Sequence, residues 1–507
     1  MPEPTAVAEP TYRLGEWQPT VNRNEYRERF DAIKRAIARG DTYQVNYTMR
    51  LRSSFSGNPH AFFVDLLPAQ RADYAAYIET DDFAICSVSP ELFFHFDGNT
   101  ITCRPMKGTR PRGRFPEEDR AMADELRDSE KERAENVMVV DMIRNDLGRI
   151  AEFGSVRVPE LFTLERYPTL WQMTSSVTAQ TSASFTELIS ALFPCASVTG
   201  PPKSSTMRLI AELETTPRRI YTGSIGYFAP DRRASFNVAI RTALIDKHRG
   251  SIEYGVGGGI VWDSQQQSEY EECLSKAAVL RRRVPPFDLL ETILWTPEGG
   301  FHLLDRHLQR LVASADFFDR RIDLHVIRDE LNELTANLDP IAHRVRLLAA
   351  ESGAITLQAT PLSHPDRSSK LTRMKLASKP VDSADVFLFH KTTHRSVYDD
   401  ALRDAGDCDD VVLCNERGEI TESTIANIVV VIDGKKFTPP VACGLLAGTF
   451  RAELVAKGEI SERVITLAQL QQAERLYLIN SVRGWAPALL EAEPVGVSTD
   501  ESDCRSQ

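Results

Sequence analysis

Residues 103–113 read Cys-Arg-Pro-Met-Lys-Gly-Thr-Arg-Pro-Arg-Gly, so Lys107 lies two residues after a proline and directly before a glycine, among three arginines. A free lysine has a pKa of about 10.4, and it becomes a nucleophile only where burial or neighbouring cations favour the loss of its proton. Arg104 and Arg110 could provide those cations. Taken alone, the stretch is more typical of a basic surface turn, so the other motifs must decide whether this lysine is reactive.

The length and composition of the chain limit what it can be. Its 507 residues exceed one ordinary hydrophobic core and predict two domains. An apolar content of 42% and a charged content of 26% are typical of a soluble globular protein, and the net charge of -12 argues against nucleic acid or an anionic membrane as the main partner. The eight cysteines form no CxxC pair and no zinc-type spacing. With no signal-peptide pattern and no bilayer-length apolar run, a cytoplasmic protein is expected.

Two predicted helices carry acidic residues on one face. Residues 128–146 are predicted to be helical, with Glu135 sharing the apolar face with two methionines, so its carboxylate would point inward. A buried carboxylate needs a cation, which can be a salt-bridge partner or a metal ion. Glu269, Glu272 and Lys276 also share one helical face, and by themselves they would be an ordinary solvated stripe.

Several segments of the first half resemble the chorismate-utilising enzymes, the family of anthranilate synthase component I, aminodeoxychorismate synthase component I and the isochorismate synthases. The resemblance covers roughly residues 22–283. It rests on the Lys107 stretch and on segments 40–46, 89–91, 131–149, 193–203, 221–227, 239–242, 254–261 and 269–276. Lysine at position 107 is typical of the aminodeoxychorismate synthases, whereas anthranilate synthases usually carry alanine there. Gln172 stands where many relatives have histidine, so no role of that histidine is carried over.

The resemblance implies that the first half aminates chorismate. Lys107 would attack C2 while Glu91 protonates the hydroxyl that leaves C4, and Mg²⁺ on Glu135 and Glu272 would bind the ring carboxylate. Gln44 stands where water-adding isochorismate synthases have lysine, and an amide cannot take a proton from water. The implied contacts to the two substrate carboxylates, with Arg241 suited to a bidentate grip, come from Thr199, Gly200, Tyr221, Arg241, Gly257 and Gly258.

A run of charge followed by prolines at residues 281–286 predicts the joint between two domains. The expected domains are residues 22–283, which would bind chorismate, and residues 284–497. Residues 1–21 and 498–507 are expected to be disordered. Because relatives normally carry further strands before the segment at residues 40–46, the chain is expected to be a trimmed form or to begin upstream.

Segments 301–311, 386–395, 421–427, 444–451 and 480–484 resemble the fold type IV pyridoxal-phosphate enzymes, a group that includes 4-amino-4-deoxychorismate lyase and branched-chain aminotransferases. The first residues of the second of these segments, 386–390, are predicted to form a buried strand that ends at Lys391, which matches the lysine that holds the cofactor covalently. Glu422 would face the pyridine nitrogen and keep it protonated. The implied ligands of the cofactor phosphate are Arg310, Thr449, Phe450 and Ser481.

Together the two resemblances imply consecutive steps, from chorismate to p-aminobenzoate for folate. The expected fold is α+β or α/β in two domains, a chorismate-binding β-sandwich with helices followed by a fold type IV domain. The first half would act as an aminodeoxychorismate synthase with ammonia from a separate glutaminase subunit, and the second as a lyase that releases pyruvate. A homodimer through the second domain is also expected. The alternatives are an amino-acid aminotransferase in the second half, or a non-catalytic first half that docks the glutaminase.

Overall fold

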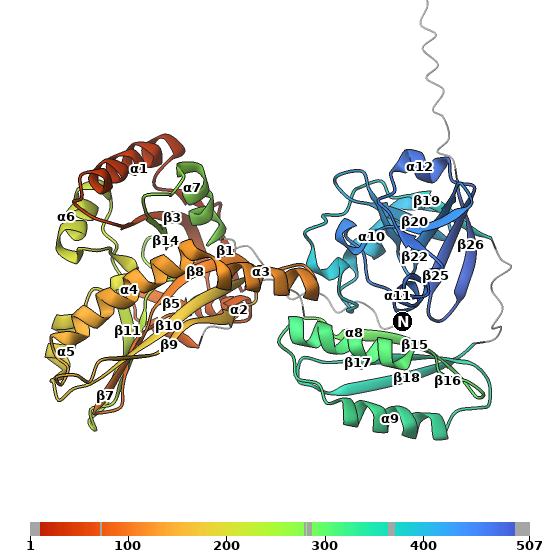
Figure 1. The fold of residues 1–507 in the computed structure, drawn as a ribbon, viewed down its shortest axis with the longest axis horizontal. Coiled ribbons are helices and arrows are strands. Elements are labelled where there is room, and N and C mark those ends of the chain that lie inside the picture. The colour runs from red at the N-terminus through yellow and green to blue at the C-terminus, as the bar shows by residue number, and fades with distance from the viewer. Residues whose placement is uncertain (1–10, 71–72, 278–279, 281–285, 363–370, 492–507) are drawn as a thin grey trace, which may run out of the picture. The chain divides into compact units, whose positions relative to one another are not determined.

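The computed structural model describes residues 11–70, 73–277, 280, 286–362 and 371–491. These residues form two compact units (Figure 1). The first unit runs to Arg112 and resumes at Arg120, whereas Gly113–Asp119 belong with the residues from 286 onward in the second unit. The predicted joint at residues 281–285 and the predicted tail at residues 498–507 lie outside the described residues. No helix within the described ranges is long and apolar enough to cross a membrane.

The first unit contains two seven-stranded sheets. In the first of them the strand order is β1-β3-β14-β13-β5-β4, and β2 also pairs with β3. Its strands are β1 (Tyr12–Leu14), β2 (Gln18–Pro19), β3 (Val45–Gly57), β4 (Tyr74–Glu79), β5 (Phe83–Ser89), β13 (Thr242–Asp246) and β14 (Ser251–Ile260). The helices that contribute to its hydrophobic core are α1 (Arg23–Ala38), α2 (Pro59–Gln70), α6 (Lys203–Leu213) and α7 (Gln266–Ser275).

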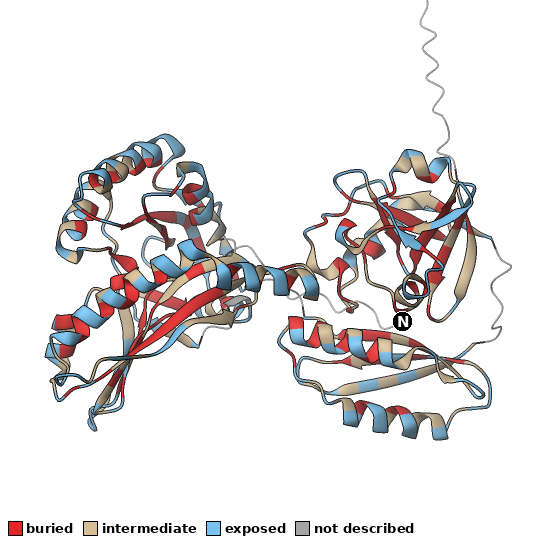
Figure 2. Ribbon diagram, in the orientation of Figure 1, coloured by how far each residue is buried: buried red, intermediate tan, exposed pale blue. Residues whose placement is uncertain are grey.

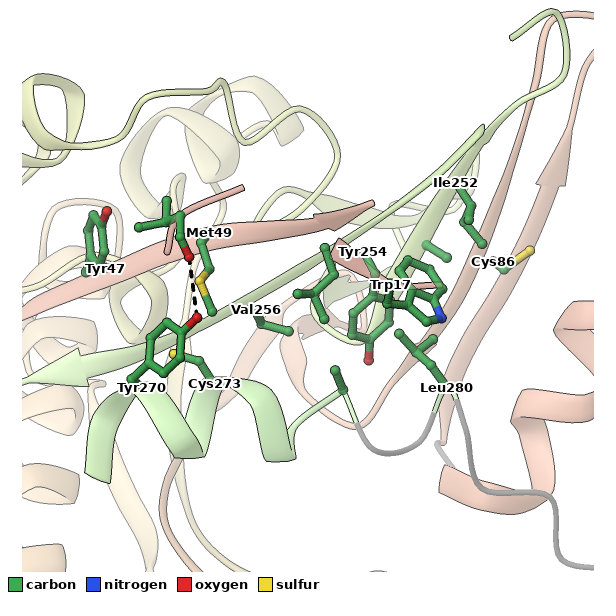
Figure 3. Packing of buried hydrophobic residues seen from close by; sticks show 14 of the residues in the cluster. Trp17, Tyr47, Met49, Cys86, Ile252, Tyr254, Val256, Tyr270, Cys273 and Leu280 are labelled. Atoms are coloured by element: carbon green, nitrogen blue, oxygen red, sulfur yellow. Dashed lines mark hydrogen bonds between the residues drawn. The ribbon is translucent and has the colours of Figure 1, made fainter. Parts of the chain in front are cut away.

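Residues 11–21 are ordered, although the whole lead 1–21 was predicted to be disordered. The strands β1 and β2 pair with β3, and Trp17 lies edge-on to Tyr254 with only 8% of its surface exposed (Figure 3). The prediction was wrong for this part because it gave weight to proline and glutamate content. Isolated apolar residues such as Trp17 and Val21 bury enough surface against the sheet to order the segment.

The second sheet of this unit has the order β11-β12-β6-β7-β10-β8, with β9 paired to β10. Its strands are β6 (Leu92–Phe96), β7 (Thr100–Arg104), β8 (Met106–Pro111), β9 (Arg157–Arg166), β10 (Leu170–Gln180), β11 (Ser224–Phe228) and β12 (Ala234–Val238). The neighbouring helices are α3 (Pro116–Asp128), α4 (Glu130–Gly148), α5 (Phe185–Leu192) and the 3-10 helix η1 (Ala196–Val198). The predicted helix 128–146 corresponds to α4, which begins after its N-cap Ser129 and buries Val139, Val140 and Ile143 in the core of this sheet.

The second unit combines a four-stranded and an eight-stranded sheet. The first has the order β16-β15-β17-β18 and the second β21-β20-β19-β26-β25-β22-β23-β24. The elements of the four-stranded part are β15 (Leu289–Thr296), β16 (Gly300–Phe301), α8 (Leu304–Phe317), α9 (Leu324–Ala336), β17 (His343–Ala349) and β18 (Ile355–Pro361). The other elements are β19 (Thr372–Leu376), η3 (Val386–Leu388), α10 (Ser396–Ala405), β20 (Asp410–Cys414), β21 (Ile420–Ser423), β22 (Asn427–Ile432), β23 (Lys435–Thr438), η4 (Val441–Cys443), α11 (Thr449–Ala456), β24 (Ser461–Glu462), α12 (Leu467–Gln471), β25 (Arg475–Asn480) and β26 (Gly484–Leu490). Figure 2 shows that buried residues are concentrated in the strands of both units.

Residues 386–390 do not form the predicted strand. The 3-10 helix η3 occupies their first part, and the side chain of its N-cap Asp385 accepts a hydrogen bond from the Phe387 N–H at 3.0 Å. The apolar run correctly indicated burial, since Leu388 and Phe389 belong to a hydrophobic cluster. Over so few residues, an apolar run does not distinguish a strand from a helical turn, and the local capping interaction decided between them.

The burial of Trp17 predicts that the described part of the lead stabilises the first unit. We expect Trp17→Ala to lower the free energy of unfolding of this unit by about 3 kcal/mol, because truncating a buried aromatic residue leaves a cavity. Trp262→Ala is the matched control, since 60% of that side chain is exposed. Urea unfolding followed by circular dichroism measures both. Equal effects of the two substitutions would show that the lead is not part of the core.

Candidate active sites

Lys107 lies on β8, where two side chains hold the backbone beside it. Asn136 of α4 donates from Nδ2 to the Lys107 carbonyl at 3.2 Å, and Gln172 of β10 donates from Nε2 to the Gly108 carbonyl at 2.8 Å. The Lys107 side chain extends to β14, where a Cβ on Gly259 would lie 2.5 Å from Nζ. Glycine at position 259 therefore allows the amine to lie against the backbone of the other sheet.

The two arginines near Lys107 in the sequence have other partners. Arg104 pairs with Glu165 at 2.7 Å, and Arg110 pairs with glutamates of α3 and α4 at 3.0 Å each. Their charges are thus compensated, which does not support the predicted role of favouring proton loss from the lysine. The anionic neighbour of Lys107 is Glu135 of α4, whose Oε2 lies 3.7 Å from Nζ.

Gln44 and Glu91 are buried polar residues with unsatisfied atoms in the same region. Neither Oε1 nor Nε2 of Gln44 has a hydrogen-bond partner among the described residues, and Nε2 would lie 3.0 Å from a Cβ on Gly259. Oε1 of Glu91 likewise has no hydrogen-bond partner among the described residues. Burial raises the pKa of Glu91 to about 7, although hydrogen bonds from Ser197 and the Met106 N–H oppose the shift. Buried polar atoms are normally satisfied, so these point to a ligand or water in this space.

Glu135 of α4 is joined by two glutamates of α7, Glu269 and Glu272, and by a second lysine, Lys276, directly after that helix. Burial raises the pKa of Glu135, and the charge of Glu272 adds to this shift, while Lys107 opposes it. Lys276 lowers the pKa of Glu272 and lies 2.8 Å from it. Glu269 was not predicted as a site residue, yet burial and the charge of Glu272 raise its pKa. Its position one turn before Glu272 on the same helix face was the available signal.

These carboxylates fit a hard divalent cation in their chemistry. Glu135 and Glu272 come from different helices, and the charge of Glu272 raises the pKa of both Glu135 and Glu269. Carboxylate oxygens are the ligands that Mg²⁺ prefers, usually one or two of them together with substrate oxygens and waters. No group of three or more histidine, cysteine, aspartate or glutamate side chains in the described part of the chain could hold a metal by itself. A cation at this place would therefore be held by no more than two of these carboxylates, together with other oxygen ligands.

Arg241 and Tyr221 form a separate cationic and hydroxyl pair. Arg241 lies in the corner between β12 and β13 with a φ of +49°, and its guanidinium has no partner among the described residues. Burial lowers the pKa of Arg241 and raises that of Tyr221, and Tyr254 and Tyr167 are further neighbours of the guanidinium. Tyr221 lies in the turn before β11, and a side chain on Gly255 would overlap its ring.

The remaining predicted substrate-binding residues differ in whether their backbone groups are accessible to a ligand. Thr199 uses its N–H for the Ala196 carbonyl at 3.3 Å, and its hydroxyl also bonds to carbonyls of the same turn. Gly200 has a φ of +152° and packs against the Gln44 carbonyl, where a Cβ would overlap. On β14, the Gly257 carbonyl accepts from Lys276 at 2.9 Å, and a Cβ on Gly258 would lie 3.1 Å from a Glu269 oxygen. Both donors of Thr199 are thus occupied, whereas the glycines leave the backbone accessible.

The second unit contains a cavity of about 610 Å³. Five of the predicted cofactor ligands line it, namely Arg310, Lys391, Glu422, Thr449 and Ser481, whereas Phe450 packs beside the hydrophobic cluster of Leu454. Lys391 follows η3, and its carbonyl accepts from the Leu290 N–H of β15 at 2.9 Å. Burial, and then the charge of Arg310, lower the pKa of Lys391 to about 8. A lysine with this pKa is available as a nucleophile or base near neutral pH.

Glu291 of β15, a residue that the sequence analysis did not single out, fixes Arg310. Its two oxygens accept from Nε and Nη2 of Arg310 at 2.9 and 2.7 Å, and Oε2 lies 2.6 Å from Nδ1 of His307. The opposite ring nitrogen of His307 lies 3.2 Å from the Thr449 hydroxyl. Burial raises the pKa of Glu291, but Arg310 and His307 outweigh it and lower the pKa to about 2. The carboxylate therefore stays charged and holds the guanidinium in one orientation.

Glu422 and the start of α11 face the same cavity. The Tyr398 hydroxyl and the Leu446 N–H donate to Oε1 of Glu422 at 2.8 and 3.1 Å, and burial raises its pKa to about 7. Helix α11 begins after Gly448, which provides no side-chain cap, so the first N–H groups of the helix are open to an anion. A lysine, a carboxylate and an open helix start around one cavity fit a cofactor with a phosphate group and a ring nitrogen.

Comparison with known proteins agrees with the division into two units. Residues 2–282 match the family described as chorismate binding enzyme, and residues 288–490 match amino-transferase class IV. Aminodeoxychorismate synthase component 1 of Escherichia coli (strain K12) is 41% identical over 263 residues, which are 52% of this chain and 58% of that protein. The Bacillus subtilis (strain 168) protein of the same name is 42% identical over 254 residues, 50% of this chain and 54% of that protein. The chain thus spans little more than half the length of these relatives.

One solved structure is similar to part of this chain. It is a Mesorhizobium loti protein provisionally described as an amino-acid aminotransferase, 38% identical, and the match covers 40% of this chain and all of that one with a TM-score of 0.39. The family match over residues 2–282 covers more than half of the chain. The chain therefore belongs to the chorismate binding enzyme family, and a class IV aminotransferase-like domain follows its chorismate-binding region in the sequence.

Proposed function

We propose that the chain converts chorismate to p-aminobenzoate in two steps. The first unit replaces the C4 hydroxyl of chorismate by ammonia, and the second unit eliminates pyruvate from the resulting 4-amino-4-deoxychorismate. One observation carries the proposal above all. The Lys107 amine lies against the Gly259 backbone, beside the unsatisfied amide of Gln44 and the Glu135 carboxylate. A nucleophile and unpaired polar atoms are thus directed into the same space.

In the first step Lys107 is the nucleophile and Glu91 the general acid. The amine forms a bond to C2, the ring double bond shifts, and the C4–O bond breaks as Glu91 gives its proton to the departing hydroxyl, which leaves as water. Ammonia then adds at C4 while the C2–N bond breaks, which releases Lys107. Because burial raises the pKa of Glu91 to about 7, the carboxyl group keeps a proton to give near neutral pH.

The two carboxylates of chorismate would be held at opposite ends of the site. Glu135 and Glu272 would hold Mg²⁺, which when bound supplies an electrostatic grip on the ring carboxylate. Glu269 lies next to this pair and adds negative charge. Arg241 binds the enolpyruvyl carboxylate with both arms of its guanidinium, and the Tyr221 hydroxyl donates to the same group. Among the described residues the Arg241 guanidinium has no hydrogen-bond or ion-pair partner, which supports this assignment.

In the second step Lys391 moves the proton. Pyridoxal phosphate, when bound in the cavity, supplies an electron sink for the elimination. Lys391 takes the C4 proton, the C3–O bond breaks, and the products are p-aminobenzoate and pyruvate. Arg310, oriented by Glu291, and the first N–H groups of α11 bind the phosphate, while Glu422 faces the ring nitrogen. Ammonia for the first step comes from a glutaminase subunit, which agrees with the "component 1" in the names of the relatives.

The whole proposal is tested with the purified full chain, chorismate, Mg²⁺ and ammonium chloride. We expect p-aminobenzoate and pyruvate in equal amounts when pyridoxal phosphate is added, without any keto acid. In Lys391→Ala, 4-amino-4-deoxychorismate should accumulate instead, whereas the exposed control Lys457→Ala should behave as the unmodified chain. A requirement for a keto acid would favour an aminotransferase. Unchanged chorismate in every reaction would contradict the assignment of the first unit.

The nucleophile is tested by trapping it. With chorismate and Mg²⁺ but no ammonia, the mass of the intact chain should increase by that of chorismate minus water. Lys107→Ala should abolish this adduct and lower chorismate amination by on the order of 10³-fold. Lys247→Ala is the matched control, because this lysine lies in the turn after β13 and pairs with Glu79 at the end of β4. Full amination activity in Lys107→Ala would disprove the nucleophilic role.

The raised pKa of Glu91 predicts a pH dependence. A general acid works in its protonated form, so kcat/KM for chorismate should fall as the pH rises through about 7, provided that the concentration of free ammonia is held constant. In Glu91→Gln the rate should be low at every pH and this decline should vanish. If the decline persists in Glu91→Gln, another group is the acid.

A further inference from the structure

The four-stranded sheet of the second unit has one covered face and one open face. On β17, Val345 and Leu347 are buried among residues of α8 and α9. Because side chains alternate along a strand, Arg344 and Arg346 share the opposite face, and both are exposed. Two like charges thus stand two residues apart, roughly 7 Å along the strand.

The open face forms one wall of the second cavity. Thr292 of β15 and Gln358 of β18 are the direct neighbours of Arg346 across the sheet, and all three residues line the cavity. Arg344 lines it together with its neighbour Thr360 on β18. Thr292, Arg346 and Gln358 thus form part of the wall of the cavity that Lys391 also lines.

The charges of Arg344 and Arg346 are uncompensated. Neither side chain has a hydrogen-bond, ion-pair or ring partner within the described residues. Arg310 on the same cavity differs, because Glu291 holds it through two hydrogen bonds. Among the residues that line the cavity, Glu422 is the one carboxylate, and its partners are Tyr398, Asn427 and a backbone N–H. The wall formed by β17 therefore lacks negative charge.

We propose that Arg344 and Arg346 are specificity-determining residues that bind the two carboxylates of a dianionic ring substrate in the second site. This inference rests on the proposed function, since 4-amino-4-deoxychorismate carries a ring carboxylate and an enolpyruvyl carboxylate. The phosphate of the cofactor would be held by Arg310 and the start of α11, so it would not account for the two guanidinium groups of β17. Guanidinium groups bind carboxylates through paired, charge-assisted hydrogen bonds. An ordinary amino acid with one carboxylate would leave one arginine unpaired, and the site would favour the lyase substrate.

The test uses the full chain loaded with pyridoxal phosphate and two probes, benzene-1,3-dicarboxylate and benzoate. Binding is followed by the visible absorbance of the cofactor, which reports on the second site alone. We expect Arg344→Gln and Arg346→Gln each to weaken binding of the dicarboxylate about ten-fold or more. The same variants should raise KM for 4-amino-4-deoxychorismate similarly while kcat changes less. Arg344→Lys and Arg346→Lys should recover part of the loss because they keep the charge.

Arg328→Gln on α9 is the control. This arginine pairs with Asp305 and is not among the residues that line the cavity, so its loss should change neither probe binding nor KM. Amination of chorismate should be equal in all variants. If p-aminobenzoate forms but the glutamine variants keep dicarboxylate affinity and KM within two-fold, the inference is wrong and the proposed function stands. If no p-aminobenzoate forms from 4-amino-4-deoxychorismate, yet the dicarboxylate binds through these arginines, the lyase assignment fails and the dianion site stands.

Discussion

The contact between the Lys107 amine and the Gly259 backbone is the constraint on which the first unit depends. Lys107 belongs to β8 in one seven-stranded sheet, and Gly259 belongs to β14 in the other. A side chain at position 259 would occupy the space of the amine. Glycine at this position of β14 therefore leaves room for the lysine amine next to Gln44 and the acidic residues of α7.

The electrostatics of this site follow from the cost of burying charge. Lys107 and Lys276 lie beside Glu135 and Glu272, so each cation compensates an anion that would otherwise be expensive to remove from water. The compensation is incomplete, because burial still raises the pKa of Glu135 and of Glu269. An additional cation would relieve the repulsion that remains among these glutamates. A ligand that brings positive charge to α7, such as the proposed Mg²⁺, would thus stabilise the charged forms of these glutamates.

Four of the arginines that line the cavity of the second unit fall into two kinds. Arg310 is held by Glu291, and Arg395 donates to the Thr424 carbonyl and stacks over Tyr398, so the protein fixes their positions. Arg344 and Arg346 have no such partners in the part of the chain that the structure describes. A fixed guanidinium suits a permanently bound group, because its orientation does not change with turnover. An unpaired one suits a substrate that arrives and leaves, since no internal ion pair has to break first.

The sequence by itself determined the two families, because the residues of their motifs stand at fixed spacings, and it predicted the side chains that the proposed sites use. It also determined α4, whose helical periodicity and N-cap are local properties. Only the tertiary structure decided the partners. It assigned Arg104 to Glu165, ordered Trp17 against β14, and revealed Glu269 and Glu291. These outcomes depend on contacts between residues far apart in the chain, and no local pattern records which of several possible partners a buried charge or an apolar side chain will meet.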